Sequence, residues 1–367
     1  MNTDYMAQAL ALARHGIGQT SPNPAVGAVI VRDGVVVGSG FHTYAGVKHA
    51  ETIALEEAGE RARGATLYIT LEPCSHQGRT APCADALIAA GIAKVVAAMQ
   101  DPNPLVGGDG FRRLRQADIE VEISSAHTVE AEHLNEPFVY FMLHRQPLVM
   151  LKAAVTLDGK IAAPDDNQGW ITSELARAHV QQLRHSSDAI MTGIGTVLGD
   201  DCLMTDRSGK PRSRPLLRIV LDSQLRLSPN SKMVSSCRND VLVVTTSAAS
   251  AERRKVLESR GVRILVCDGA DGRVDLRSVV DHLAREKYLS LMIEAGSKVN
   301  WAALNSGVVD KIFFYYAPKI LGGLQSLPVA GGTGRRRRAD AIRFRNVQIH
   351  SIAPDEFAVE AYFVKEV

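Results

Sequence analysis

Apolar positions in the first part of the chain follow helical and strand repeats in turn. Residues 3–15 carry apolar side chains at helical spacing. Asp33-Gly34, a dipeptide favoured in tight hairpins, separates two apolar runs and predicts strands at 26–32 and 35–41. The remaining pattern predicts helices at 49–60 and from about residue 82, strands at 66–71 and 94–99, and a helix–strand pair at 109–124. We therefore expect a three-layer α/β unit.

The pattern changes after residues 125–146, a stretch of mixed charge that we interpret as a connecting helix. From residue 148 onward, apolar strands alternate with helical segments, which indicates a largely parallel sheet. The predicted strands are 148–155, 188–193, 216–222, 240–246, 262–267, 290–294 and 311–317, and the predicted helices are 173–186, 251–260, 274–287 and 298–306. Two final strands, near 344–351 and 357–364, are typical of a hairpin that closes one edge of the sheet.

Length and composition agree with this division. At 367 residues the chain is too long for a typical single core, so we expect two domains, at 1–145 and 146–367. A hydrophobic fraction of 46% and a charged fraction of 22% are typical of a soluble globular protein. The net charge of +2 provides no field that would attract nucleic acid, and no apolar run reaches the length of a membrane span.

The five cysteines are odd in number and irregular in spacing, which makes a poor disulfide framework. That usage fits a reducing compartment. The N-terminal sequence lacks the basic region of a signal peptide. These features predict a cytoplasmic protein.

The most specific chemical signal is His49-Ala50-Glu51, followed by Pro73-Cys74 and by Cys83. One imidazole and two thiolates bind zinc tetrahedrally, and a fourth position left to water makes the metal catalytic. Zinc lowers the pKa of a bound water to roughly 7. Glu51 lies close enough to His49 in sequence to carry a proton between that water and a leaving amino group. The zinc nucleobase deaminases use this constellation, and their Glu is not a metal ligand.

The spacing of the two cysteines departs from the commonest deaminase pattern, Pro-Cys-x-x-Cys. Eight residues separate Cys74 from Cys83, and they bring His76, Arg79 and Thr80 to the rim of the site. Arg and His side chains there suit a substrate that carries phosphate. Two alternatives stay open: His76 could be a fourth ligand that closes the site, or the zinc could be purely structural.

The segment Thr70–Cys83, TLEPCSHQGRTAPC, resembles the signature of the bifunctional riboflavin-biosynthesis deaminase/reductase of bacteria. Ser21–Val29, Gly40-Phe41-His42 and Ala45-Gly46 resemble it as well, and the resemblance covers nearly the whole chain. It implies a cytidine-deaminase-like three-layer α/β/α fold for the N-terminal domain. Ala81 stands where the family usually has Pro, a change that we expect to be harmless.

The resemblance also implies roles for the residues around the metal. His49, Cys74 and Cys83 would bind zinc, and Glu51 would be the general acid/base. Asn23 and His42 would read the base, while His76 and Arg79 would lie near the sugar phosphate.

Two glycine-containing loops in the second domain follow apolar strands. Glu294–Ser297 opens a predicted helix, so its backbone N–H groups are presented where phosphate could bind. Gly193–Thr196 is a similar strand exit. Neither loop is the six-residue Rossmann pattern, and such loops often only cap a helix.

Several segments of the second domain resemble the reductase half of the same family, which is similar in fold to dihydrofolate reductase and binds NADPH across the strand ends. They are Lys152, Asp158–Lys160, Trp170–Ser173, Thr196–Asp201, Asp222-Ser223 and Ala317–Lys319. The resemblance implies dinucleotide contacts from Trp170, Thr172, Thr196, Asp200, Ser223 and Gly296. It implies contacts to the sugar phosphate and the pyrimidine from Arg184, Leu203, Arg207 and Glu294. Guanidinium groups suit a phosphate monoester, because they bind it through paired hydrogen bonds.

Two positions of this domain depart from the family pattern, and several other residues admit more than one interpretation. Gln168 stands where the family usually has Ser, and Cys202 stands where Pro is usual; neither change removes a charged contact. The run Arg335–Arg338 follows a glycine-rich segment and is interpreted as a solvated loop, with a nucleic-acid patch or a phosphate-facing lid as the alternatives. Trp170 could instead be a core residue, Lys152 a solvated strand end, and Asp200 a turn residue.

The expected function is a zinc-dependent deamination of a diaminopyrimidinone ribosyl phosphate, followed by NADPH-dependent reduction of its ribosyl group to a ribityl chain. Lys152 and Asp200 are the candidates for the proton donor in the second step. The expected partner is a small-molecule substrate, with no nucleic acid and no membrane, and the resemblance leaves a homo-oligomer open. Three alternatives are a transfer-RNA deaminase, a zinc-stabilised binding protein without catalysis, and a deaminase with a silent reductase half.

Overall fold

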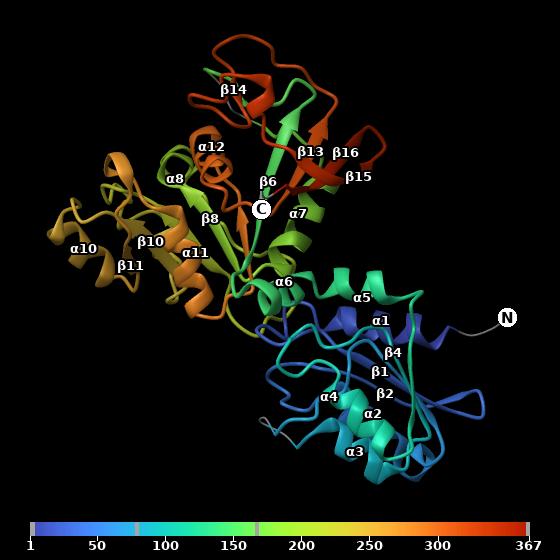
Figure 1. The fold of residues 1–367 in the computed structure, drawn as a ribbon. Helices are drawn as coiled ribbons and strands as arrows, with labels where there is room; N and C mark the ends of the chain where they lie inside the picture. The colour runs from blue at the N-terminus through green and yellow to red at the C-terminus, as the bar shows by residue number, and fades with distance from the viewer. Residues whose placement is uncertain (1–3, 78–80, 166–168, 365–367) are drawn as a thin grey trace. The chain divides into compact units, whose positions relative to one another are not determined.

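The computed structural model describes residues 4–77, 81–165 and 169–364 (Figure 1). The chain divides into two compact units. One contains the chain up to Arg145 together with Pro211–Arg214. The other contains Gln146–Lys210 and the chain from Pro215 onward.

Over the described residues, the N-terminal unit has a five-stranded sheet in the order β2-β1-β3-β4-β5. The strands are β1 (Gly27–Arg32), β2 (Val35–Phe41), β3 (Thr66–Ile69), β4 (Lys94–Ala97) and β5 (Glu120–Ile123). Strand β1 is antiparallel to β2 and β3, whereas β3, β4 and β5 run parallel. The predicted hairpin is confirmed, because Asp33 and Gly34 have φ values of 52° and 75°, as a two-residue primed turn requires.

Helices cover both faces of this sheet, which confirms the predicted three layers (Figure 1). On one face, α1 (Tyr5–His15) and α5 (Thr128–Leu134) share a buried cluster with alternate residues of β1 and β4. On the other face lie α2 (Ala50–Ala58), α3 (Cys83–Ala90) and α4 (Asp109–Gln116). A short 3-10 turn at Gly59–Ala62 follows α2.

The connecting segment forms two helices, α5 and α6 (Glu136–His144), where one was predicted. Asn135 between them has φ −107° and ψ 21°, and Pro137 occupies the first turn of α6. Proline is tolerated in a first turn but interrupts a helix interior, so the sequence favours a break here.

Within the described residues, the second unit is built on a nine-stranded sheet in the order β11-β10-β9-β8-β12-β6-β13-β16-β15. The strands are β6 (Leu148–Thr156), β8 (Ala189–Gly193), β9 (Leu217–Leu221), β10 (Val241–Thr245), β11 (Arg263–Val266), β12 (Ser290–Ile293), β13 (Lys311–Ala317), β15 (Phe344–Ala353) and β16 (Glu356–Phe363). From β11 to β13 all neighbours are parallel, and β16 and β15 close one edge as an antiparallel hairpin. The predicted sheet is therefore confirmed.

Two sets of helices cover the faces of this second sheet. One face carries α11 (Leu276–Arg285) and α12 (Ser297–Ser306), and the other carries α7 (Glu174–Ser186), α8 (Ile194–Asp200), α9 (Lys232–Ser235) and α10 (Ala251–Glu258). Single turns lie at Ala270–Gly272 and Arg338–Asp340, and β7 (Lys160–Ala162) pairs with β14 (Leu327–Pro328). None of the described helices combines the length and the apolar character needed to span a membrane.

Candidate metal centre and dinucleotide site

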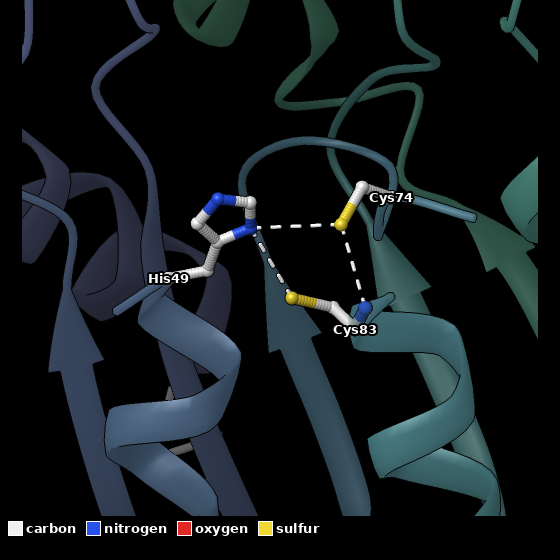
Figure 2. A group of neighbouring side chains, drawn as sticks. All are labelled: His49, Cys74 and Cys83. Carbon is white, nitrogen blue, oxygen red and sulfur yellow. Dashed lines mark hydrogen bonds between the residues drawn. The ribbon is translucent and has the colours of Figure 1, made fainter. Parts of the chain in front are cut away.

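The three predicted metal ligands lie together, two at the starts of helices and one in a loop (Figure 2). His49 is the residue immediately before α2, Cys83 is the first residue of α3, and Cys74 lies in the loop after β3. The Nδ1 atom of His49 is 3.2 Å from Cys83 Sγ and 3.6 Å from Cys74 Sγ. All three donor atoms lie within 4.8 Å of one another.

This donor set fits zinc, because mixed imidazole and thiolate ligation favours it over harder cations. The backbone N–H of Cys83 donates to Cys74 Sγ at 3.4 Å. Hydrogen bonding from the Cys83 side chain, and next from His49, holds the pKa of Cys74 well below that of a free thiol. The site therefore favours a thiolate, which is the form that binds metal.

Glu51 lies in the first turn of α2, and only 3% of its surface is exposed. Burial, followed by the nearby Cys74, raises the pKa of Glu51 to about 7. A group with a pKa close to the working pH can both accept and donate a proton. Glu51 is not one of the grouped ligands, and neither is His76, whose side chain is exposed.

Asn23 and His42, both predicted to read the base, lie beside the metal ligands. His42 Nδ1 is 2.9 Å from the carbonyl oxygen of Lys48, so Nδ1 carries the proton and donates it. The Nε2 atom then accepts from Asn23 Nδ2 at 3.1 Å. The His42 and His49 ring centroids are 5.3 Å apart. Arg79, predicted to contact the phosphate, lies outside the described residues.

A buried carboxylate, Glu72, and a half-buried one, Asp101, lie near the cysteines, and the sequence singled out neither. Glu72 accepts hydrogen bonds from the backbone N–H groups of Asp101, Gly108 and Phe111. A side chain at Gly110 would bring its Cβ to 2.0 Å from the carbonyl oxygen of Pro73, so only glycine allows this approach. Burial raises the pKa of Asp101, and the nearby charges of Glu72, His76 and Cys74 also act on this carboxyl group.

Asn135 is a further residue that sequence reasoning missed. Its side chain accepts from the N–H of Ala25 at 2.8 Å and donates to the carbonyl of the same residue at 2.9 Å. It thereby fixes the segment that carries Asn23. The partners are 110 residues apart, so no local pattern could have revealed the contact.

Replacing Asn135 with alanine is expected to lower the free energy of unfolding by about 2 kcal/mol, because two buried peptide groups lose their partners. It should also raise the KM of the deaminase step, since Asn23 is no longer held. Steady-state kinetics together with urea unfolding would measure both effects. Asn135→Asp keeps the acceptor and should cost less; equal losses in the two variants would contradict this explanation.

In the second unit, Glu294 joins two buried cations at the carboxyl end of β12. Lys152 Nζ is 3.0 Å from Glu294 Oε1, and Arg184 donates to Oε2 from Nε at 3.2 Å and from Nη2 at 3.0 Å. Burial alone would raise the pKa of Glu294, but the two cations outweigh it and hold the pKa at about 2. With two cations against one carboxylate, the cluster has an excess positive charge that suits an anionic ligand.

Unpaired polar atoms line the carboxyl ends of the parallel strands. Thr192 Oγ1, Asp222 Oδ1, Thr245 Oγ1 and Ser297 Oγ are buried and have no hydrogen-bond partner among the described residues. They lie at or just beyond the ends of β8, β9, β10 and β12. Buried polar atoms are normally paired, and ligands of open α/β sheets bind at this edge. The chemistry of these atoms therefore fits an extended dinucleotide.

The predicted dinucleotide contacts are distributed around the same edge. A Cβ at Gly296 would lie 3.8 Å from Thr196 Oγ1, so these two residues are neighbours. Trp170 is 68% exposed and stacks under the Arg177 guanidinium, which rules out the alternative that it is a core residue. Thr172 is buried, Ser223 follows β9 by two residues, and Asp200 is the exposed last residue of α8.

Two of the four predicted substrate contacts, Leu203 and Arg207, follow α8. The carbonyl of Leu203 accepts from the buried Arg218, and the backbone N–H of Arg207 donates to Gln181. Burial, followed by the charge of Asp200, raises the pKa of Cys202 to about 11, so this thiol stays neutral at pH 7. Gln168, the other departure from the family pattern, lies outside the described residues.

A cavity of about 930 Å³ lies at the opposite edge of the sheet, at the amino ends of β6 and β13. Its lining includes Arg277, Arg335 and Arg343 and contains none of the residues predicted to bind substrate or dinucleotide. The buried charges and the unpaired polar atoms instead gather at the carboxyl edge, where the predicted dinucleotide and substrate contacts lie.

Comparison with known proteins identifies both halves of the chain. The cytidine and deoxycytidylate deaminase zinc-binding region matches residues 1–99, and the RibD C-terminal domain matches residues 147–356. The riboflavin biosynthesis protein RibD of Escherichia coli (strain K12) is 43% identical over 366 residues, which cover 96% of each chain. That of Actinobacillus pleuropneumoniae is 41% identical, with 96% of this chain and 93% of the relative covered.

Solved structures agree with these matches. Acinetobacter baumannii RibD is 37% identical and superposes with a TM-score of 0.86 over 98% of both chains. A deaminase/reductase from Thermotoga maritima is 34% identical, with a TM-score of 0.82 over 98% of both chains. The predicted order of a cytidine-deaminase-like domain followed by a reductase domain is thus confirmed. The chain belongs to the RibD family of riboflavin biosynthesis, which joins a zinc-binding deaminase to a reductase in one polypeptide.

Proposed function

We propose that each unit carries out one of two successive reactions on the same small molecule. The N-terminal unit hydrolytically deaminates a diaminopyrimidinone ribosyl phosphate, and the second unit reduces the ribosyl group of the product to a ribityl chain. The observation that carries the proposal is the grouping of His49, Cys74 and Cys83 beside the buried Glu51. The separate Lys152–Glu294–Arg184 cluster supports the second reaction.

In the deaminase unit, His49, Cys74 and Cys83 would hold zinc. Zinc in such a site supplies a nucleophilic water at neutral pH. Glu51 would take one proton from the attacking water and give it to the ring nitrogen. It would then carry the second proton from the new hydroxyl group to the amino group, which leaves as ammonia while the carbonyl forms. Burial raises the pKa of Glu51 to about 7, so at neutral pH the carboxyl group can both accept and donate a proton.

Recognition in the deaminase unit belongs to side chains around the ligands. Asn23 and His42 orient the base, because their mutual hydrogen bond fixes the amide and the imidazole next to His49. His76 and Arg79 would contact the sugar phosphate. Asp101 joins this group, since its charge acts on His76.

In the reductase unit, Trp170, Thr172, Thr196, Asp200, Ser223 and Gly296 would bind NADPH, which supplies the hydride. Glu294 holds Lys152 and Arg184 in place, and Arg184, Leu203 and Arg207 would contact the substrate. Of the two candidate proton donors, we favour Lys152, because its ammonium lies inside the cluster whereas Asp200 is exposed.

Other functions are less well supported. A transfer-RNA deaminase would need a strong basic face, and the net charge is only +2. A binding protein without catalysis gives no reason for a buried Glu51 beside the metal ligands. A silent reductase half is disfavoured by the intact pairing of Lys152, Glu294 and Arg184.

A cytoplasmic location fits the five unpaired cysteines, and a homo-oligomer is compatible with the family.

The decisive experiment supplies the diaminopyrimidinone ribosyl phosphate and NADPH to purified, zinc-loaded protein and follows ammonia and NADPH absorbance together. We expect both signals, with NADPH oxidation lagging behind ammonia release, because the second reaction consumes the product of the first. Ammonia without NADPH oxidation would refute the reductase assignment. Neither signal, in protein shown to contain zinc, would refute the substrate.

A further inference from the structure

A buried imidazole–carboxylate pair lies beside the Glu294 cluster and has no part in the reactions described so far. His185, in the last turn of α7, places Nδ1 at 2.9 Å from Asp206 Oδ2. The two side chains are only 4% and 7% exposed. Burying two polar side chains is unfavourable unless they are paired, so each of these groups makes the burial of the other possible.

Asp206 belongs to the loop that carries Arg207. Its second oxygen, Oδ1, accepts from the backbone N–H of Ser208 at 2.9 Å, which closes a turn around Arg207. The N–H of Arg207 itself donates to Gln181 Oε1 at 2.9 Å. The backbone on both sides of Arg207 is therefore held, while its own side chain is exposed.

One face of α7 supplies all these anchors. Gln181, Arg184 and His185 are three and four residues apart and so lie on the same helix face. Arg184 reaches the same loop through its Nη1, which donates to the carbonyl of Thr205 at 2.9 Å. Arg184 also binds Glu294, so a single side chain connects the loop to the Lys152–Glu294–Arg184 cluster.

We propose that the His185–Asp206 pair is a positioning device for the reductase substrate, because it fixes the loop that presents Arg207 to the sugar phosphate. The inference rests on the proposed function, in which Arg207 binds that phosphate. A guanidinium whose backbone is fixed in advance loses less conformational entropy when phosphate binds. His185 and Asp206 act through Arg207 and do not touch the substrate themselves.

The test compares the deaminated pyrimidine ribosyl phosphate with the same compound after removal of its phosphate. His185→Ala should raise the KM of the phosphorylated substrate roughly five- to tenfold and leave kcat within about twofold. The KM of the dephosphorylated substrate should stay unchanged. His185→Asn should restore most of the lost affinity, because its amide nitrogen can donate to Asp206 from nearly the position of the imidazole Nδ1.

Two further variants separate positioning from general destabilisation and from failure of the proposed function. Val279→Ala shortens a buried side chain of α11, whose core cluster contains no residue of the Arg207 loop. It should lower stability, and its KM ratio for the two substrates should match wild type. If His185→Ala raises both KM values equally, or behaves like Val279→Ala, the positioning inference is overturned and the function stands. Arg207→Ala should abolish the preference for phosphate; an unchanged preference would refute both the role of Arg207 and the inference built on it.

Discussion

Replacement of Glu51 with glutamine is expected to reduce ammonia release by roughly 10²- to 10⁴-fold, because the variant loses the buried carboxylate in the helix turn that follows His49, which is the proposed proton carrier. The variant should fold normally. Burial raises the pKa of Glu51 to about 7, so the folded protein already disfavours the ionised carboxylate, and a neutral amide of the same shape is easily accommodated. Ammonia release and zinc content per chain would be measured on the same preparation.

Glu56→Gln is the matched control for this variant. It makes the same chemical change on the same helix, at an exposed side chain paired with Lys48, and should leave turnover intact. Loss of zinc together with activity in Glu51→Gln would mean that Glu51 supports the metal site and is not the proton carrier. Substantial remaining turnover at full zinc occupancy would remove Glu51 from the mechanism.

The second large effect is expected from Glu294→Gln, which should abolish NADPH oxidation while ammonia release continues. The change leaves Lys152 and Arg184, 8% and 9% exposed, without their shared anion. Breaking a buried ion pair in this way costs about 3–5 kcal/mol of unfolding free energy. Denaturant unfolding of the second unit and the two-signal activity assay would measure the two losses.

The stability loss should depend on pH in a defined direction. The pKa of Glu294 is lowered from its usual 4.5 to about 2, so its contribution is fully present above about pH 4.5 and disappears as the pH falls toward 2. The difference in unfolding free energy between wild type and Glu294→Gln should therefore be constant above pH 5 and shrink below it. Glu286→Gln, at an exposed pair with Arg263, should change stability by less than about 0.5 kcal/mol. A difference that grows on acidification would contradict the assigned ion pairing.

Local patterns were sufficient for most of the fold. The turn at Asp33-Gly34 requires positive φ at both residues, and dipeptides such as Asp-Gly and Asn-Gly are favoured because they adopt it readily. The hairpin could therefore be predicted from the sequence. Helix α8 was missed because Gly195 and Gly199 lower its helix propensity. Burial of Ile194 and Val197 against the sheet stabilises it regardless, and such tertiary contacts cannot be read locally.

The candidate sites likewise contain residues that the sequence predicted and residues that it did not. The metal ligands were predictable because zinc chemistry restricts both residue type and spacing, and the structure groups them. Asn135, Glu72 and the His185–Asp206 pair were not predicted, since each acts through a partner that is remote in sequence or through backbone groups. Residue type alone does not distinguish such a positioning side chain from an ordinary buried polar residue.

Two backbone contacts join the ends of the segment between the metal-binding cysteines. The N–H of Cys83 meets Cys74 Sγ at 3.4 Å, and the N–H of Ala84 donates to the Cys74 carbonyl at 3.1 Å. The two ligands are thus joined to each other by backbone groups at the ends of the segment. We therefore expect changes in the residues between them to alter substrate selection more than the arrangement of the metal ligands.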